Sequence, residues 1–152
     1  MYINYNRKEA GIMSSDFIPE ADVNIDTLTA LYKRAFYKCD KDEDGDLRVN
    51  TDGPRVLITV NEENKLVRFT AIYRFKENEP EDKKLHFINR MNDKFIFARF
   101  SMPELDHDVL VADYYLPYED GLPAFQLIKA LRTFANIVVA GIRACDEDGL
   151  VG

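Results

Sequence analysis

The segment Asp40-Lys41-Asp42-Glu43-Asp44-Gly45-Asp46-Leu47 is the most specific chemical motif in the chain. Carboxylates at loop positions 1, 3 and 5, glycine at 6 and an apolar residue at 8 match the first half of an EF-hand calcium loop. The second half does not match, because Thr51 stands where a bidentate glutamate belongs and Gly53-Pro54 precede a predicted strand. We favour an acidic, solvated turn between a helix and a strand, with weak calcium binding as the alternative.

A shorter acidic motif, Cys145-Asp146-Glu147-Asp148-Gly149-Leu150, stands at the end of the chain. Too few residues follow it to wrap around an ion. Carboxylates are also unfavourable at the negative end of a helix, so they are expected beyond the last ordered turn. We therefore predict a frayed acidic terminus.

Residue sets that could perform catalysis are sparse. The serines are Ser14, Ser15 and Ser101, and none stands in a Gly-x-Ser-x-Gly turn. A carboxylate beside His107 could polarise its ring, but adjacent side chains in a hairpin loop point apart, so we expect a surface loop. The sequence also has no phosphate loop and no Gly-x-Gly-x-x-Gly run. We predict no enzymatic activity and assign no catalytic, cofactor-binding or metal-ligating residue.

Basic and aromatic residues are expected together on the outer face of the predicted sheet. The basic residues are Arg68, Arg74 and Arg99, and Asp113 and Thr70 are expected across from them. The aromatic residues are Phe95, Phe97 and Tyr115. Such a set can stack nucleic-acid bases. However, 27 acidic against 20 basic residues give a net charge of −7, which repels phosphate backbones. Cross-strand ion pairing is therefore the preferred interpretation, and we predict no nucleic-acid partner.

The charge is unevenly distributed along the chain. Residues 100–152 carry 9 acidic and 3 basic residues, whereas residues 1–99 carry 18 and 17. A partner that contacts the last third is therefore expected to be basic or to avoid that surface.

The cysteines and the apolar runs favour a cytoplasmic protein without a membrane partner. Cys39 and Cys145 are the only cysteines, and two ordinary buried thiols suit a reducing compartment. The first residues contain no apolar run of the signal-peptide kind. The longest unbroken apolar run near the C-terminus, residues 137–142, is far shorter than a membrane span.

A chain of 152 residues is predicted to form one domain over 22–152, preceded by a flexible N-terminal tail over 1–21. Met13 is a second candidate start, which would make the first 12 residues an upstream extension. Hydrophobic periodicity predicts an α+β fold in the order helix, three strands, helix, two strands, helix, with the helices packed on an antiparallel sheet. The ranges are about 25–39, 47–50, 55–60, 65–75, 80–92, 94–102, 109–116 and 123–145.

Three apolar faces follow from this periodicity. The first helix is expected to bury Ile25, Leu28, Leu31, Tyr32, Ala35, Phe36 and Cys39, capped by Asn24 or Asp26. The strand over 94–102 is expected to bury Ile96, Ala98, Phe100 and Met102, and Pro117 is expected to stop the following strand. On the last helix, Ala130, Ile137 and Gly141 widen the apolar arc beyond one sheet contact, which indicates a candidate interface.

The order of elements and several stretches resemble the YbjN-like family, known as putative bacterial sensory transduction regulators. The stretches are the helix with its acidic turn, Phe95-Ile96-Phe97-Ala98-Arg99-Phe100, and Asp113-Tyr114-Tyr115-Leu116 leading through Asp120-Gly121-Leu122 into the last helix. The resemblance covers about residues 22–145 and implies a fold similar to type III secretion chaperones, which are small, acidic, dimeric proteins that hold extended segments of other proteins.

The leading hypothesis is a non-enzymatic regulatory module that recognises a segment of a protein partner and forms a homodimer. The interface is expected at Ala130, Ile137 and Gly141, or at the sheet around Phe95 and Phe97. The alternative is a regulatory domain that senses a small molecule or an ion, either in the acidic turn or in a pocket between helix and sheet.

Overall fold

A computed structural model describes residues 16–152 of the chain. It confirms the α+β class and, in outline, the predicted order of helices and strands. The elements are β1 (Phe17–Ile18), the 3-10 helix η2 (Glu20–Asp22), α1 (Ile25–Arg34), β2 (Cys39–Lys41), β3 (Leu47–Asn50), β4 (Arg55–Asn61), β5 (Leu66–Arg74), α2 (Glu81–Lys94), β6 (Arg99–Ser101), β7 (Val109–Pro117), β8 (Leu122–Pro123) and α3 (Ala124–Cys145).

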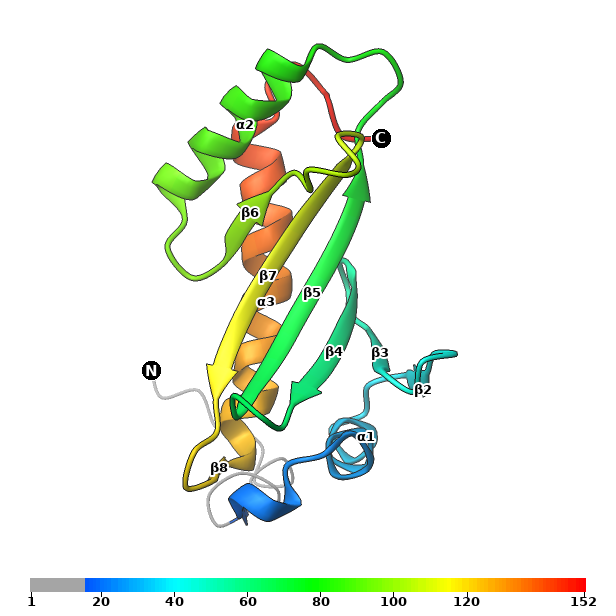
Figure 1. Cartoon of the computed structure of the whole chain (residues 1–152), viewed down its shortest axis with the longest axis vertical. Helices are drawn as coiled ribbons and strands as arrows, with labels where there is room; N and C mark the ends of the chain where they lie inside the picture. The colour runs from blue at the N-terminus through cyan, green and yellow to red at the C-terminus, as the bar shows by residue number, and fades with distance from the viewer. Residues whose placement is uncertain (1–15) are drawn as a thin grey trace, which may run out of the picture.

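Six strands form an antiparallel sheet in the order β2-β3-β4-β5-β7-β6, and β1 pairs with β8 in a separate two-stranded sheet. The helices α1 and α3 lie on one face of the large sheet, and the long strands β5 and β7 cross in front of α3 (Figure 1). Alternation along β5 explains this arrangement. Val67, Phe69 and Ala71 are buried toward the helices, whereas Ile72 and Arg74 are exposed on the other face.

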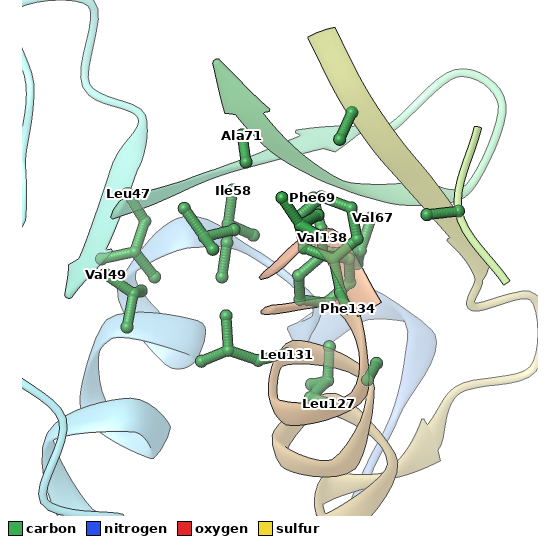
Figure 2. Packing of buried hydrophobic residues seen from close by; sticks show 14 of the residues in the cluster. Leu47, Val49, Ile58, Val67, Phe69, Ala71, Leu127, Leu131, Phe134 and Val138 are labelled. Carbon is green, nitrogen blue, oxygen red and sulfur yellow. The ribbon is translucent and has the colours of Figure 1, made fainter. Parts of the chain in front are cut away.

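The core lies between the sheet and α3. Buried residues of β3, β4 and β5 face the side of α3 that carries Leu127, Leu131, Phe134 and Val138, as Figure 2 shows. The hydroxyl of Tyr32 on α1 donates a buried hydrogen bond of 2.9 Å to the carbonyl of Leu127. The first half of α3 is therefore attached to α1 as well as to the sheet.

The helix α3 is long and apolar enough to cross a membrane by length and composition. Its longest unbroken apolar run, residues 137–142, does not reveal this property, because polar residues interrupt the apolar ones along the rest of the helix. Its apolar side packs against β5, β7 and α2. The apolar character of α3 is thus accounted for by the core of the domain.

The first helix ends five residues earlier than predicted. Asn24 caps its start, because its side-chain oxygen accepts a hydrogen bond of 2.9 Å from the N–H of Thr27. It ends at Arg34, and Cys39, expected on its apolar face, belongs to the strand β2. The spacing of apolar residues continued past the true end because Tyr37 and Cys39 still pack against the core from outside the helix.

The predicted strand over 94–102 is mostly not a strand. The helix α2 continues to Lys94, and β6 contains only Arg99–Ser101. Ile96, expected to be buried, is 99% exposed. The physical reason is a side-chain clamp: the amide of Asn92 accepts from the N–H of Phe100 at 2.9 Å and donates to its carbonyl at 2.8 Å. Asn92 thus satisfies the backbone N–H and carbonyl of Phe100 at the edge of β6.

Both ends of the described chain are more ordered than the sequence indicated. Within the predicted tail, residues 17–18 form β1 and residues 20–21 begin η2; residues 1–15 of that tail lie outside the described residues. At the other end, the carboxylate of Asp146 accepts hydrogen bonds from the N–H groups of Leu150 and Val151, and Leu150 is fully buried. The acidic terminus is therefore folded back rather than frayed. Pro117, expected to stop its strand, is the last residue of β7.

Candidate binding surfaces

The acidic segment after α1 forms a β-hairpin turn between β2 and β3. One oxygen of Asp42 accepts hydrogen bonds from the N–H groups of Asp44 (3.1 Å) and Asp46 (2.8 Å), and Gly45 adopts a φ of +84°. The carboxylate of Asp40 pairs with Arg48 across the hairpin. These carboxylates therefore stabilise the turn, and the strand β3 follows where an EF-hand would have its second helix.

Asp113 organises the open face of the sheet. It is 1% exposed and accepts two hydrogen bonds from Arg99 (3.0 and 2.7 Å) and one from Arg68 (3.0 Å). Both guanidinium groups also lie over the ring of Tyr115, at 5.4 and 5.9 Å from its centre. The predicted cross-strand ion pairing is confirmed for these residues. Arg74 instead faces Asp106, at 4.0 Å. The positive charge of Arg68 and Arg99 is thus partly neutralised within the chain.

The predicted interface around Phe95 and Phe97 is turned inward. Phe97 stacks on Tyr114 with ring centres 4.0 Å apart, and Phe95 is half-buried beside the core. A shallow hollow of about 450 Å³ borders this segment. Ile96, between the two phenylalanines, is the side chain that reaches solvent. The predicted burial of Ala98 and Phe100 is confirmed, and the alternation fails at Ile96, which precedes the short strand β6.

The predicted interface on α3 is covered by the chain itself. Ala130 and Gly141 are buried, and Ile137 is half-buried against the core. A Cβ atom at Gly141 would lie 2.8 Å from the methyl group of Met91 on α2. The small residues therefore permit close packing of α2 on α3 within one chain, and they do not provide a free surface for a second copy. The homodimer stays a prediction, and this surface does not support it.

Phe36 has an unusual backbone conformation and an unusual exposure. It follows α1 with a φ of +66°, in the left-handed region, and its side chain is 92% exposed. Its N–H bonds to the carbonyl of Lys33, and the N–H of Tyr37 bonds to the carbonyl of Tyr32, each at 3.0 Å. This hydrogen-bond pattern is a Schellman motif, in which glycine usually occupies the left-handed position. A bulky residue there is strained, and such strain concentrates at functional sites.

A groove of about 1020 Å³ opens beside Phe36. It arises because α1 has 10 residues, about 15 Å, and covers only part of the 22-residue α3, which is about 33 Å long. The loop between β3 and β4 forms the opposite wall; a Cβ atom at Gly53 would lie 2.7 Å from Val139 of α3. The lining residues are Ala35, Phe36, Tyr37, Lys38, Asn50, Thr51, Asp52, Gly53, Arg132, Ala135, Asn136, Val139, Ala140 and Arg143.

The charged side chains of this groove are mostly basic. Lys38, Arg132 and Arg143 line it together with one carboxylate, Asp52. All three basic residues are exposed, and none has an ion-pair partner within residues 16–152. The part of α3 that lines this groove is therefore basic, although residues 100–152 are acidic as a whole. The acidic residues of that third lie outside α3, which carries only bases.

Sequence reasoning missed this groove. The apolar spacing predicts Ala35 and Phe36 on the buried face of a longer helix, and no local pattern in the sequence brings Lys38 together with Arg132 and Arg143. One signal was available, since Phe36-Tyr37-Lys38 interrupts the helix with two aromatic residues before an acidic turn. No glycine marks the left-handed position, so the end of the helix could not be located.

These features define an α+β domain with an open groove, an exposed aromatic residue at its margin and no assembled catalytic set in the described residues. The model of the YbjN family, with the description "Putative bacterial sensory transduction regulator", matches residues 24–147, so the chain belongs to the YbjN family. It is similar to the crystal structure of YbjN, a "putative transcription regulator" from E. coli, with a TM-score of 0.69 and 14% identity, over 85% of this chain and 95% of that one. At this identity the likeness shows the fold alone. No curated protein sequence matches the chain.

Proposed function

We propose that this YbjN-family chain is a non-enzymatic regulatory module that holds a segment of a partner protein in the groove between α1, the β3–β4 loop and α3. The observation that carries the proposal is Phe36, an aromatic side chain 92% exposed on a strained left-handed backbone beside that groove. Exposed aromatic residues are the usual anchors of protein interfaces. Holding a segment in this way would be a chaperone-like action.

The dimensions of the groove suit an extended segment. The stretch of α3 that lines it, residues 132–143, rises by about 17 Å. An extended chain of about five residues spans this length. The apolar part of the lining includes Ala135 and Val139, and the side-chain amide of Asn136 also lines the groove. A peptide could thus place apolar side chains inward and keep its main chain hydrated.

The alternative is a sensor of a small molecule. A volume of about 1020 Å³ lies at the upper limit of the usual 300–1,000 Å³ for such sites. Small-molecule sites generally bury most of their ligand, whereas Phe36, Lys38 and Ala140 at this groove are exposed. The open margin favours a macromolecular segment over an enclosed ligand.

Affinity capture from the protein's own cell, read by native mass spectrometry, tests the proposal. We expect a co-purifying protein that is lost with Phe36→Ala and retained with Leu105→Ala. Leu105 is the control because its apolar side chain is also fully exposed but does not line the groove. Equal recovery by both variants would contradict the proposal, and a retained small molecule in place of a protein would favour the sensor.

A further inference from the structure

The groove concentrates positive charge on a protein that is otherwise acidic. The chain has a net charge of −7, yet Lys38, Arg132 and Arg143 face one groove with only Asp52 of opposite sign. Elsewhere in residues 16–152, basic side chains commonly pair with carboxylates, as Arg99 does with Asp113. The three groove residues have no such partner in the described part of the chain.

The basic residues come from separate elements. Lys38 follows α1, whereas Arg132 and Arg143 stand on the first and second halves of α3. Eleven positions separate the two arginines along the helix, a rise of about 16 Å. A ligand with a single charged group could not reach both. An extended segment with several carboxylates could, since alternate side chains on one face of an extended chain recur about every 7 Å.

We propose that the segment bound in the groove is acidic: an extended stretch of a partner protein whose Asp or Glu side chains pair with Lys38, Arg132 and Arg143, and whose apolar side chain contacts Phe36. This inference rests on the proposed function and specifies its partner. Arginine suits the role because its planar guanidinium can donate two hydrogen bonds to one carboxylate. Asp52, on the β3–β4 loop that forms the opposite wall, disfavours a carboxylate beside it and so helps to set the position of the segment.

The test measures binding of a fluorescent peptide of roughly nine residues, long enough to exceed the groove at both ends. In the peptide, glutamates and one leucine occupy alternating positions so that they share one face. A matched peptide has glutamine in place of each glutamate. We expect the glutamate peptide to bind about tenfold more tightly, as the loss of a charge-assisted hydrogen bond predicts. Equal affinity for the two peptides would overturn the inference.

Charge reversal supplies the second arm of the test. Arg132→Glu should weaken binding of the glutamate peptide about tenfold, because it replaces one carboxylate partner with a carboxylate. Lys129→Glu is the matched control, because Lys129 is exposed on the same helix outside the groove and the change in net charge is equal. If both variants weaken binding equally, the effect is general electrostatic attraction and the inference is wrong.

The inference can fail while the proposed function holds. If cellular capture is lost with Phe36→Ala but unchanged with Arg132→Glu, a segment binds without acidic recognition. If neither substitution affects capture, both proposals fail. Sedimentation addresses a second copy of this chain as the occupant. A wild-type dimer that Arg132→Glu dissociates would show that the acidic ligand is the chain itself and would overturn the assignment to a partner protein.

Discussion

Replacing Phe36 with glycine should make the protein more stable while removing its proposed binding anchor. At a φ of +66° the Cβ atom of an L-residue crowds the neighbouring carbonyl, which costs about 1–2 kcal/mol. Glycine adopts this conformation without that cost. The ring of Phe36 contributes little burial to offset the gain, because it is 92% exposed. Stability and binding are thus expected to change in opposite directions at one residue.

The magnitude follows from two opposing effects. Relief of the left-handed strain favours the glycine variant, whereas the greater freedom of glycine in the unfolded chain disfavours it by about 0.4–1 kcal/mol. The free energy of unfolding should therefore rise by roughly 0.5–1 kcal/mol. For a domain of this size, that change raises the melting temperature by about 2 °C.

Urea denaturation followed by circular dichroism measures this difference. Phe36→Ala is the control, because it removes the ring but keeps a Cβ atom in the left-handed position. We expect its unfolding midpoint to stay near that of the wild type and below that of Phe36→Gly. A glycine variant less stable than both would refute the reasoning, since it would show that the ring is packed or that the turn is not left-handed.

Three further predictions concern the rest of the molecule. Asp113→Asn should lower the free energy of unfolding by about 2–3 kcal/mol, because it weakens buried, charge-assisted hydrogen bonds; a loss below about 0.5 kcal/mol in urea titrations would contradict this. Hydrogen bonding from Lys84 lowers the pKa of Asp108 below its ordinary value, so its stabilising effect is present above that value and lost as the pH falls through the lowered pKa. Thermal unfolding should therefore show wild type more stable than Asp108→Asn at about pH 6, with the difference shrinking as the pH falls below the ordinary pKa of an aspartate. Calcium binding should be no tighter than roughly millimolar by calorimetry, and micromolar binding lost with Asp42→Ala would overturn the turn assignment.

Local periodicity in the sequence was sufficient for most of the secondary structure. The alternation from Val67 to Arg74 predicted β5 and its two faces, and the spacing of apolar residues predicted α3 over nearly its whole length. These signals are reliable because a strand or helix that buries one face must repeat apolar residues at its own period. The pairing of Asp113 with arginines followed from the same alternation.

Other features depended on contacts between residues far apart in the chain. The amide of Asn92 makes two hydrogen bonds to the backbone of Phe100 in β6, and Gly141 on α3 packs closely against Met91 of α2. Periodicity indicates that a face is covered, but it does not identify what covers it. For this reason the apolar arc at Ala130, Ile137 and Gly141 did not reveal that α2 and the core cover it within one chain.

The candidate site itself belongs to the tertiary structure. The sequence shows Phe36 as one more apolar residue after a helix, and it shows residues 100–152 as an acidic third. Folding places Phe36 outside the helix in a left-handed turn and brings Lys38 to the same groove as Arg132 and Arg143. Charge counted along a chain is not charge on a surface, because folding decides which side chains share a surface. For this protein, sequence determined the elements and the class of fold, while the difference in length between α1 and α3 opened the groove.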